Sequence, residues 1–170
     1  PNRMSQMTTD EESAHIRTRL WGNAMDMFKE NVFLGIGKGR FILENSRNML
    51  AHSNFMENLA ETGGIGIFVW VSISYVAFKI LILLLNSSHS DLLIKLLSRS
   101  LLLSFIGFNV STLFITMEVD IFYFILGLIV ALYSNSCQEN DLRLKFGFAD
   151  FRNIGFVIFV MIFYYHIFLL

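Results

Sequence analysis

Four long apolar runs constrain this chain more than any other feature of its sequence. They begin at Ile65, and short polar segments separate them. About 20 consecutive apolar residues in a helix cross the hydrocarbon layer of a membrane. We expect membrane spans at about residues 65–85, 96–116, 119–133 and 154–170. The chain is therefore predicted to be an all-α integral membrane protein, with amphipathic outer-loop helices followed by about four transmembrane helices.

The charged residues divide the chain into two regions. Residues 1–64 contain seven Lys or Arg and eight Asp or Glu, whereas the 106 residues that follow contain only six of each. We therefore expect a polar loop region over 1–64 and a transmembrane region over 65–170. A net charge of −1 indicates no nucleic-acid partner. Because the first residue is Pro1 and not Met, we interpret the chain as a fragment of a larger multi-span bundle.

The basic residues near the short connections predict how the chain is oriented. Short loops rich in Lys and Arg stay in the cytoplasm. The first and third connections, with their flanks, each contain three such residues, whereas the second contains none. These residues are Lys79, Lys95 and Arg99 for the first connection and Arg143, Lys145 and Arg152 for the third. Residues 1–64 are therefore predicted to lie outside. Tyr164 and Tyr165 stand near the end of the fourth apolar run, where we expect an interfacial aromatic belt.

The loop region is predicted to consist of helices joined by a glycine turn. Apolar residues recur at helical spacing from about Asp10 to Glu30, which predicts an amphipathic helix. The run from Gly35 to Gly39 has neither the Lys-Ser/Thr of a phosphate-binding loop nor the glycine spacing of a dinucleotide fold. We therefore expect it to form a tight turn.

Arginine and histidine are the residues in the loop region that are best suited to chemistry. A segment outside the cytoplasm has no access to nucleotide sugars. A transfer reaction there therefore needs an activated donor whose leaving group is a phosphate or diphosphate. Arginine binds phosphate oxygens bidentately and always stays charged. The candidates are Arg17, Arg19, Arg40 and Arg47. The alternative is that these arginines only keep a charged surface soluble.

His52 precedes a predicted helix that begins near Asn54. A helix start disfavours the charged imidazolium, and a neutral histidine can act as a general base for an acceptor hydroxyl. The alternative is a surface or capping histidine. Glu57 and Glu61 are either a carboxylate pair or one solvated helix face. No group of His, Cys, Asp and Glu has metal-site spacing, so no metal or other cofactor is expected.

Several motifs, in their order along the chain, resemble those of the O-antigen ligase and O-antigen polymerase superfamily of bacterial membrane proteins. The family signature is a His, then Asn, Ser or Gln, nine residues, a Gly, two residues, and Gly, Thr or Tyr. The residues that meet it are His52, Ser53, Gly63 and Gly66. Further matches are Arg17 with Trp21, the Gly-x-Gly-x-Gly-x-Phe turn that ends at Phe41, Glu61, and the late apolar stretch 124–132.

The resemblance implies a membrane glycosyltransferase with its site in a periplasmic loop of the bacterial inner membrane. Such enzymes move a glycan from an undecaprenyl diphosphate carrier to a lipid A-core sugar or to another lipid-linked glycan, and they need no metal. It implies catalytic roles for Arg17, on the diphosphate, and His52, on the acceptor. Arg19, Arg40 and Glu61 would bind substrate. The alternatives are a non-catalytic transporter or flippase segment, and a membrane anchor with an outer binding loop.

Overall fold

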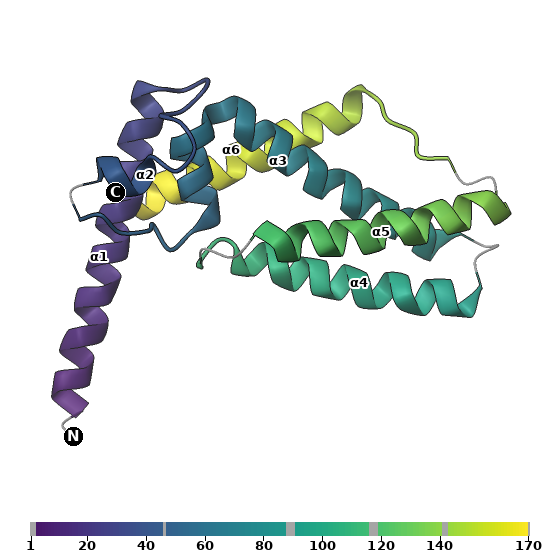
Figure 1. Ribbon diagram of the computed structural model, residues 1–170, viewed down its shortest axis with the longest axis horizontal. Coiled ribbons are helices and arrows are strands. Elements are labelled where there is room, and N and C mark those ends of the chain that lie inside the picture. Colours follow the sequence, from purple (N-terminus) through teal and green to yellow (C-terminus); the bar gives the residue numbers. More distant parts are fainter. Residues whose placement is uncertain (1–2, 46, 88–90, 116–118, 141–142, 170) are drawn as a thin grey trace. The chain divides into compact units, whose positions relative to one another are not determined.

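The computed structural model describes residues 3–45, 47–87, 91–115, 119–140 and 143–169. These residues form six helices, and no strand occurs among them. The helices are α1 (Arg3–Glu30), α2 (Phe41–Glu44), α3 (Asn54–Asn86), α4 (Leu92–Ser111), α5 (Val119–Asn140) and α6 (Phe148–Leu169) (Figure 1). The prediction of an all-α protein is confirmed.

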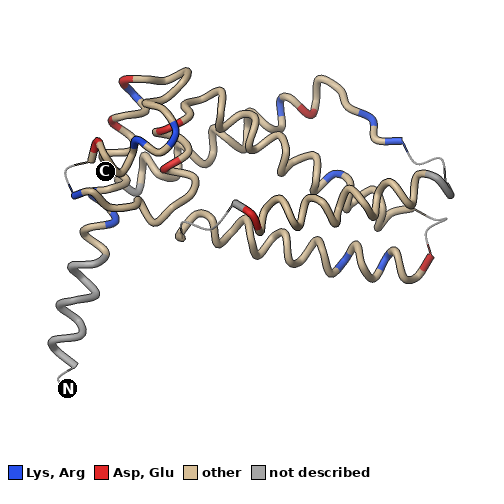
Figure 2. Tube along the Cα trace, in the orientation of Figure 1, with Lys and Arg blue, Asp and Glu red and all other residues tan. Residues whose placement is uncertain are grey.

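Helices α3 to α6 are each long and apolar enough to cross a membrane. The qualifying segments are Asn54–Asn86, Leu92–Ser111, Asp120–Cys137 and Phe148–Ile167. Long uncharged stretches run along all four helices (Figure 2). Large apolar side chains on them are exposed, including Phe124 at 68% and Phe156 at 66%. Water disfavours so much exposed apolar surface whereas lipid does not, so these helices are compatible with a multi-pass membrane protein.

Several helix ends differ from the predicted ones. Helix α1 begins at Arg3 and not near Asp10 as predicted. No Gly or Pro, the residues that most disfavour a helix, occurs between Arg3 and Asp10. Helix α4 ends at Ser111, before the predicted end of the second span. There the Thr112 hydroxyl donates to the carbonyl of Asn109 (2.7 Å), a local bond that competes with helix continuation.

The third and fourth spans are longer than predicted. Helix α5 begins at Val119 and continues to Asn140, so it is long enough to cross a membrane. Helix α6 begins at Phe148 and not at residue 154. Its start is stabilised by Asp150, whose Oδ2 accepts a hydrogen bond from the Gly147 backbone amide (2.7 Å), as a carboxylate in a first helical turn does.

The chain divides into two compact units. Unit 1 comprises residues 1–67, 113–116 and 159–170, and unit 2 comprises residues 68–112 and 117–158. In unit 2, α4 and α5 run antiparallel and pack side by side (Figure 1). Their core contains stacked phenylalanines, with the Phe122 ring 6.1 Å from that of Phe105 and 5.8 Å from that of Phe108.

Unit 2 also contains a paired charge within its apolar helices. Lys79 Nζ lies 2.5 Å from Asp150 Oδ1 and 2.7 Å from the carbonyl of Lys145. The Tyr75 hydroxyl donates to the same Asp150 oxygen (2.9 Å) and accepts from Asn153 Nδ2 (3.2 Å). A charge in an apolar segment is tolerated when a partner compensates it, so this pair fixes the start of α6 against α3 within the unit.

Tyr165 lies at the centre of the core of unit 1. Its side chain is 1% exposed, and its ring stacks on Phe55 (5.4 Å between centroids) and meets Trp21 edge-on (5.2 Å). The Tyr165 hydroxyl donates to the carbonyl of Leu113 (2.8 Å) and lies 3.1 Å from Ser53 Oγ. The expectation that Tyr165 belongs to an interfacial aromatic belt is therefore wrong, because protein surrounds its ring and its hydroxyl is paired.

Candidate functional site

Helix α3 is broken at Gly63, and the glycine turn lies against the break. Gly63 has φ 63° and ψ −164°, which no helix contains. The break leaves amides and carbonyls of α3 without helical partners, and backbone groups of residues 32–37 pair with them. The bonds are Ile36 N to Ala60 O (2.9 Å), Gly37 N to Glu61 O (2.9 Å), Gly64 N to Val32 O (2.7 Å) and Ile65 N to Phe33 O (3.2 Å).

Only glycine fits where the turn meets the break. A Cβ at Gly35 would lie 2.4 Å from the carbonyl carbon of Glu61, and a Cβ at Gly63 would lie 2.6 Å from the Gly35 nitrogen. Both residues also have positive φ angles, 66° and 63°. The run from Gly35 to Gly39 thus forms turns between α1 and α2, as predicted, and two of its backbone amides are bonded to α3.

Glu57 and Glu61 hold loops in place through their carboxylates. Glu57 Oε1 accepts from the Ala51 amide (2.7 Å), and Glu61 Oε1 accepts from the Phe41 amide (3.2 Å). Lys38 Nζ pairs with the second oxygen of Glu61 (2.9 Å). The two residues are 8% and 5% exposed, so the interpretation as a solvated helix face is wrong. These contacts give Glu61 a structural role, and its binding of substrate stays a prediction.

His52 lies on the loop that leads into α3, between two buried residues. Ala51 and Ser53 are fully buried, and His52 itself is half-buried. Ser53 Oγ accepts from the Met56 amide (3.4 Å) and so caps α3. His52 has φ 53°, a left-handed conformation that costs a residue with a Cβ about 1–2 kcal/mol. Strain of this kind is concentrated at functional sites.

A buried hydrogen bond connects helix α1 to the loop of His52. The Trp21 indole Nε1 donates to the carbonyl of Ala51 (2.8 Å), the residue directly before His52. Arg17 lies one helical turn before Trp21 and on the same face of α1, because residues four apart are neighbours on a helix. This bond therefore holds the loop of His52 against the face of α1 that carries Arg17.

We expect Trp21→Phe to destabilise the protein by about 1–3 kcal/mol, because the substitution leaves the buried Ala51 carbonyl without its donor. Thermal unfolding of the purified protein in detergent measures this loss. The control is Trp70→Phe in unit 2, since Trp70 contacts the Phe122 ring (6.4 Å) and no indole hydrogen bond is found for it within the described residues. A melting temperature equal to that of the Trp70→Phe variant would contradict the expectation.

The four candidate arginines differ in what they contact. All four are exposed. Arg40 Nε pairs with Glu44 (3.3 Å), and its guanidinium also donates to the carbonyl of Ile36 (3.4 Å). Among the residues whose side chains are described, no ion pair joins Arg17 or Arg19 to a carboxylate. Arg19 leaves α1 on another side than Arg17, since residues two apart do not share a face. Arg17 is therefore the one of these two that shares a face with Trp21, and Arg47 lies on the segment between α2 and α3 that also holds His52.

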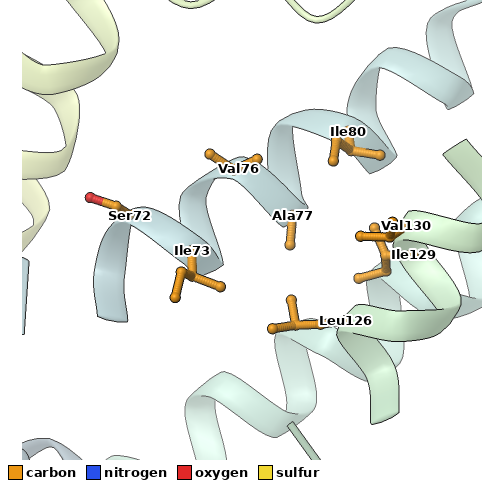
Figure 3. Close-up of a pocket in the computed structure, with 8 residues that line it drawn as sticks. All are labelled: Ser72, Ile73, Val76, Ala77, Ile80, Leu126, Ile129 and Val130. Atoms are coloured by element: carbon orange, nitrogen blue, oxygen red, sulfur yellow. The ribbon is translucent and has the colours of Figure 1, made fainter. Parts of the chain in front are cut away.

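One cavity in the described residues lies in unit 2, and its lining is almost entirely apolar. Its volume is about 300 Å³, and Ala77 of α3 and Leu126 of α5 point toward each other across it (Figure 3). Ser72 is the one residue with a polar side chain among the eight that line it. Among all the residues that the structure describes, no three His, Cys, Asp or Glu side chains are grouped as a metal site requires.

Sequence reasoning missed the role of Tyr165, which contacts Ser53 beside His52 from 112 residues away. The one signal in the sequence was that a tyrosine hydroxyl within an apolar run needs a partner.

Comparisons with family models, with curated proteins and with solved structures found no match for the chain. The resemblance to O-antigen ligases and polymerases therefore stays a prediction that rests on the motifs.

Proposed function

We propose that this chain belongs to a membrane glycosyltransferase of the O-antigen ligase or polymerase type. It would move a glycan from an undecaprenyl diphosphate carrier to a lipid A-core sugar or to a second lipid-linked glycan, at the periplasmic face of the bacterial inner membrane. The observation that supports this most is the hydrogen bond from Trp21 to Ala51 (2.8 Å). This bond joins the helix that carries Arg17 to the residue directly before His52, in a unit that also contains part of the apolar helices α3 and α6.

The proposed reaction needs one base and one cation from the protein. The acceptor hydroxyl attacks the anomeric carbon of the donor sugar while the bond from that carbon to the diphosphate oxygen breaks. His52 takes the proton of the hydroxyl, and Arg17 stabilises the diphosphate that leaves, through two parallel hydrogen bonds. Because a diphosphate is a good leaving group as an anion, it needs positive charge more than it needs a proton.

The other residues assigned to substrate have supporting roles in this proposal. Arg40 stands at the end of the glycine turn, where its pairing with Glu44 leaves an exposed guanidinium edge for phosphate or sugar oxygens. Arg19 would contact a different part of the donor, because it leaves α1 on another side than Arg17. Glu61 acts through Lys38 and Phe41, by keeping the turn in position.

A transporter is the rival function, and the Lys79–Asp150 pair is the observation that favours it. Ionisable groups within membrane spans commonly mark ion or substrate pathways. Here Asp150 accepts from Lys79, Tyr75 and the Gly147 amide, so its charge is compensated by three donors within the protein. That arrangement is typical of a structural pair, and it makes the interfacial enzyme the better-supported interpretation.

The test is a transfer assay with the intact protein in lipid vesicles. The donor is an undecaprenyl diphosphate-linked glycan, and the acceptor is either lipid A-core or a second lipid-linked glycan. We expect a larger product with one of the two acceptors, and mass spectrometry of the lipid fraction identifies which. Absence of product with both acceptors, from protein that is folded, would refute the proposed function.

Arg17→Lys is expected to reduce transfer by roughly 10- to 100-fold, because a lysine keeps the charge but makes only a single contact where the guanidinium makes two. Initial rates at saturating donor measure the effect. The matched control is Arg99→Lys, at an exposed arginine on α4 in unit 2. If both variants retain the rate of the unmodified protein, Arg17 does not contact the diphosphate.

A further inference from the structure

Three consecutive apolar residues are exposed in the middle of the polar loop region. Val32, Phe33 and Leu34, here called the apolar tip, are 45%, 75% and 74% exposed. They follow α1 after a single residue, Asn31, and the last residues of α1, Lys29 and Glu30, are charged and exposed. In water, such a run would be an unfavourable surface feature, so something other than water is expected to cover it.

The apolar tip is bonded to the point where α3 becomes apolar. The carbonyl of Val32 accepts from the Gly64 amide (2.7 Å), and the carbonyl of Phe33 accepts from the Ile65 amide (3.2 Å). Ile65 is the first residue of the first apolar run, and its side chain is 53% exposed. The tip therefore lies at the same level along α3 as the residue at which α3 would enter the membrane.

The backbone of the tip is suited to a site at the edge of a membrane. Irregular backbone is poorly tolerated in lipid unless its polar groups are paired. Two of the three carbonyls of the tip are bonded to α3, and the Gly35 amide that follows donates to the carbonyl of Asn31 (2.9 Å). The side chains can thus be surrounded by lipid while these backbone groups stay satisfied within the protein.

We propose that the apolar tip inserts its side chains into the lipid bilayer, at the boundary between headgroups and acyl chains where α3 enters. Lipid is the occupant that the structure favours, because the tip extends the exposed apolar surface that begins at Ile65. The insertion places the glycine turn, with Lys38 and Arg40, at the membrane surface. This proposal goes beyond the proposed function, since it requires a membrane but no transfer activity.

The test measures the depth of a spin label attached to the tip. The intact protein carries Cys137→Ser and one new cysteine at a time, Phe33→Cys, Ile65→Cys or Arg47→Cys, in vesicles of phosphatidylethanolamine and phosphatidylglycerol. Collision with oxygen reports lipid, and collision with a water-soluble nickel complex reports water. We expect the label at 33 to collide more with oxygen than with nickel, as at 65, and the label at 47 to show the reverse.

Two results would overturn the proposal. Nickel access at 33 equal to that at 47 would place the tip in water. An immobilised label with little access to either reagent would show that protein, and not lipid, covers the tip. Leu34→Cys repeats the measurement at a second exposed position if the variant at 33 does not fold. The transfer assay is a separate measurement. A negative result for insertion of the apolar tip therefore does not contradict glycan transfer, and a negative result for transfer does not contradict insertion.

Discussion

Replacing His52 by asparagine is expected to abolish glycan transfer while the protein stays folded. The substitution removes the base that would accept the proton of the acceptor hydroxyl, and a general base contributes about 10²- to 10⁴-fold to a rate. Asparagine is the informative replacement because it tolerates the left-handed backbone that His52 adopts (φ 53°). A loss of activity can then be assigned to the imidazole and not to a rebuilt loop.

The rate of transfer and the melting temperature should be measured on the same preparation. The matched control is His15→Asn, at an exposed histidine of α1, for which we expect the unmodified rate. Near-normal transfer by the His52→Asn variant would exclude His52 as the base. A melting temperature well below that of the His15→Asn variant would show instead that His52 is needed for the fold of its loop.

Gly35→Ala is expected to have the largest effect on the stability of unit 1. The new Cβ would lie 2.4 Å from the carbonyl carbon of Glu61, which is backbone and cannot rotate away. The residue would also keep a φ of 66°, which costs an alanine about 1–2 kcal/mol. Relief of the clash separates the turn from α3 and adds a further loss of about 1–3 kcal/mol.

Gly39→Ala is the matched control, because Gly39 lies in the same turn with a φ of 78° and a Cβ added there would meet nothing within 4 Å. It should show the backbone cost alone. The difference between the two melting temperatures in detergent then isolates the contact between the turn and the break in α3. Equal melting temperatures would mean that the turn does not pack against α3 as closely as described.

The fold class was predictable because the physics that determines it is local. A segment in lipid must satisfy its backbone polar groups internally, so each apolar run of sufficient length can only be a helix. The positions of the spans followed from hydropathy alone. The ends of α4 and α6 did not, because side chains such as Thr112 and Asp150 decide them through individual hydrogen bonds.

The sequence offered candidate site residues, which stay a prediction, but not the contacts that hold their loops. The pattern singled out Arg17, Trp21 and His52, and the structure joins Trp21 to the carbonyl of Ala51, the residue directly before His52. It did not reveal that Glu57 and Glu61 are buried, because helical spacing shows which residues share a face and not what covers that face. Their partners include the backbone amides of Ala51 and Phe41, and such contacts have no sequence signature.

The contact between Ser53 and Tyr165 determines when the neighbourhood of His52 can be completed. A ribosome adds Tyr165 only 112 residues after Ser53, on the order of ten seconds later. Until α6 has been made and packed against this loop, the loop beside His52 lacks the Tyr165 ring and Ser53, which caps α3, lacks its hydroxyl partner. A nascent chain would therefore contain His52 well before Tyr165 can pack beside Ser53, so the loop of His52 reaches its final surroundings only after α6 has been made.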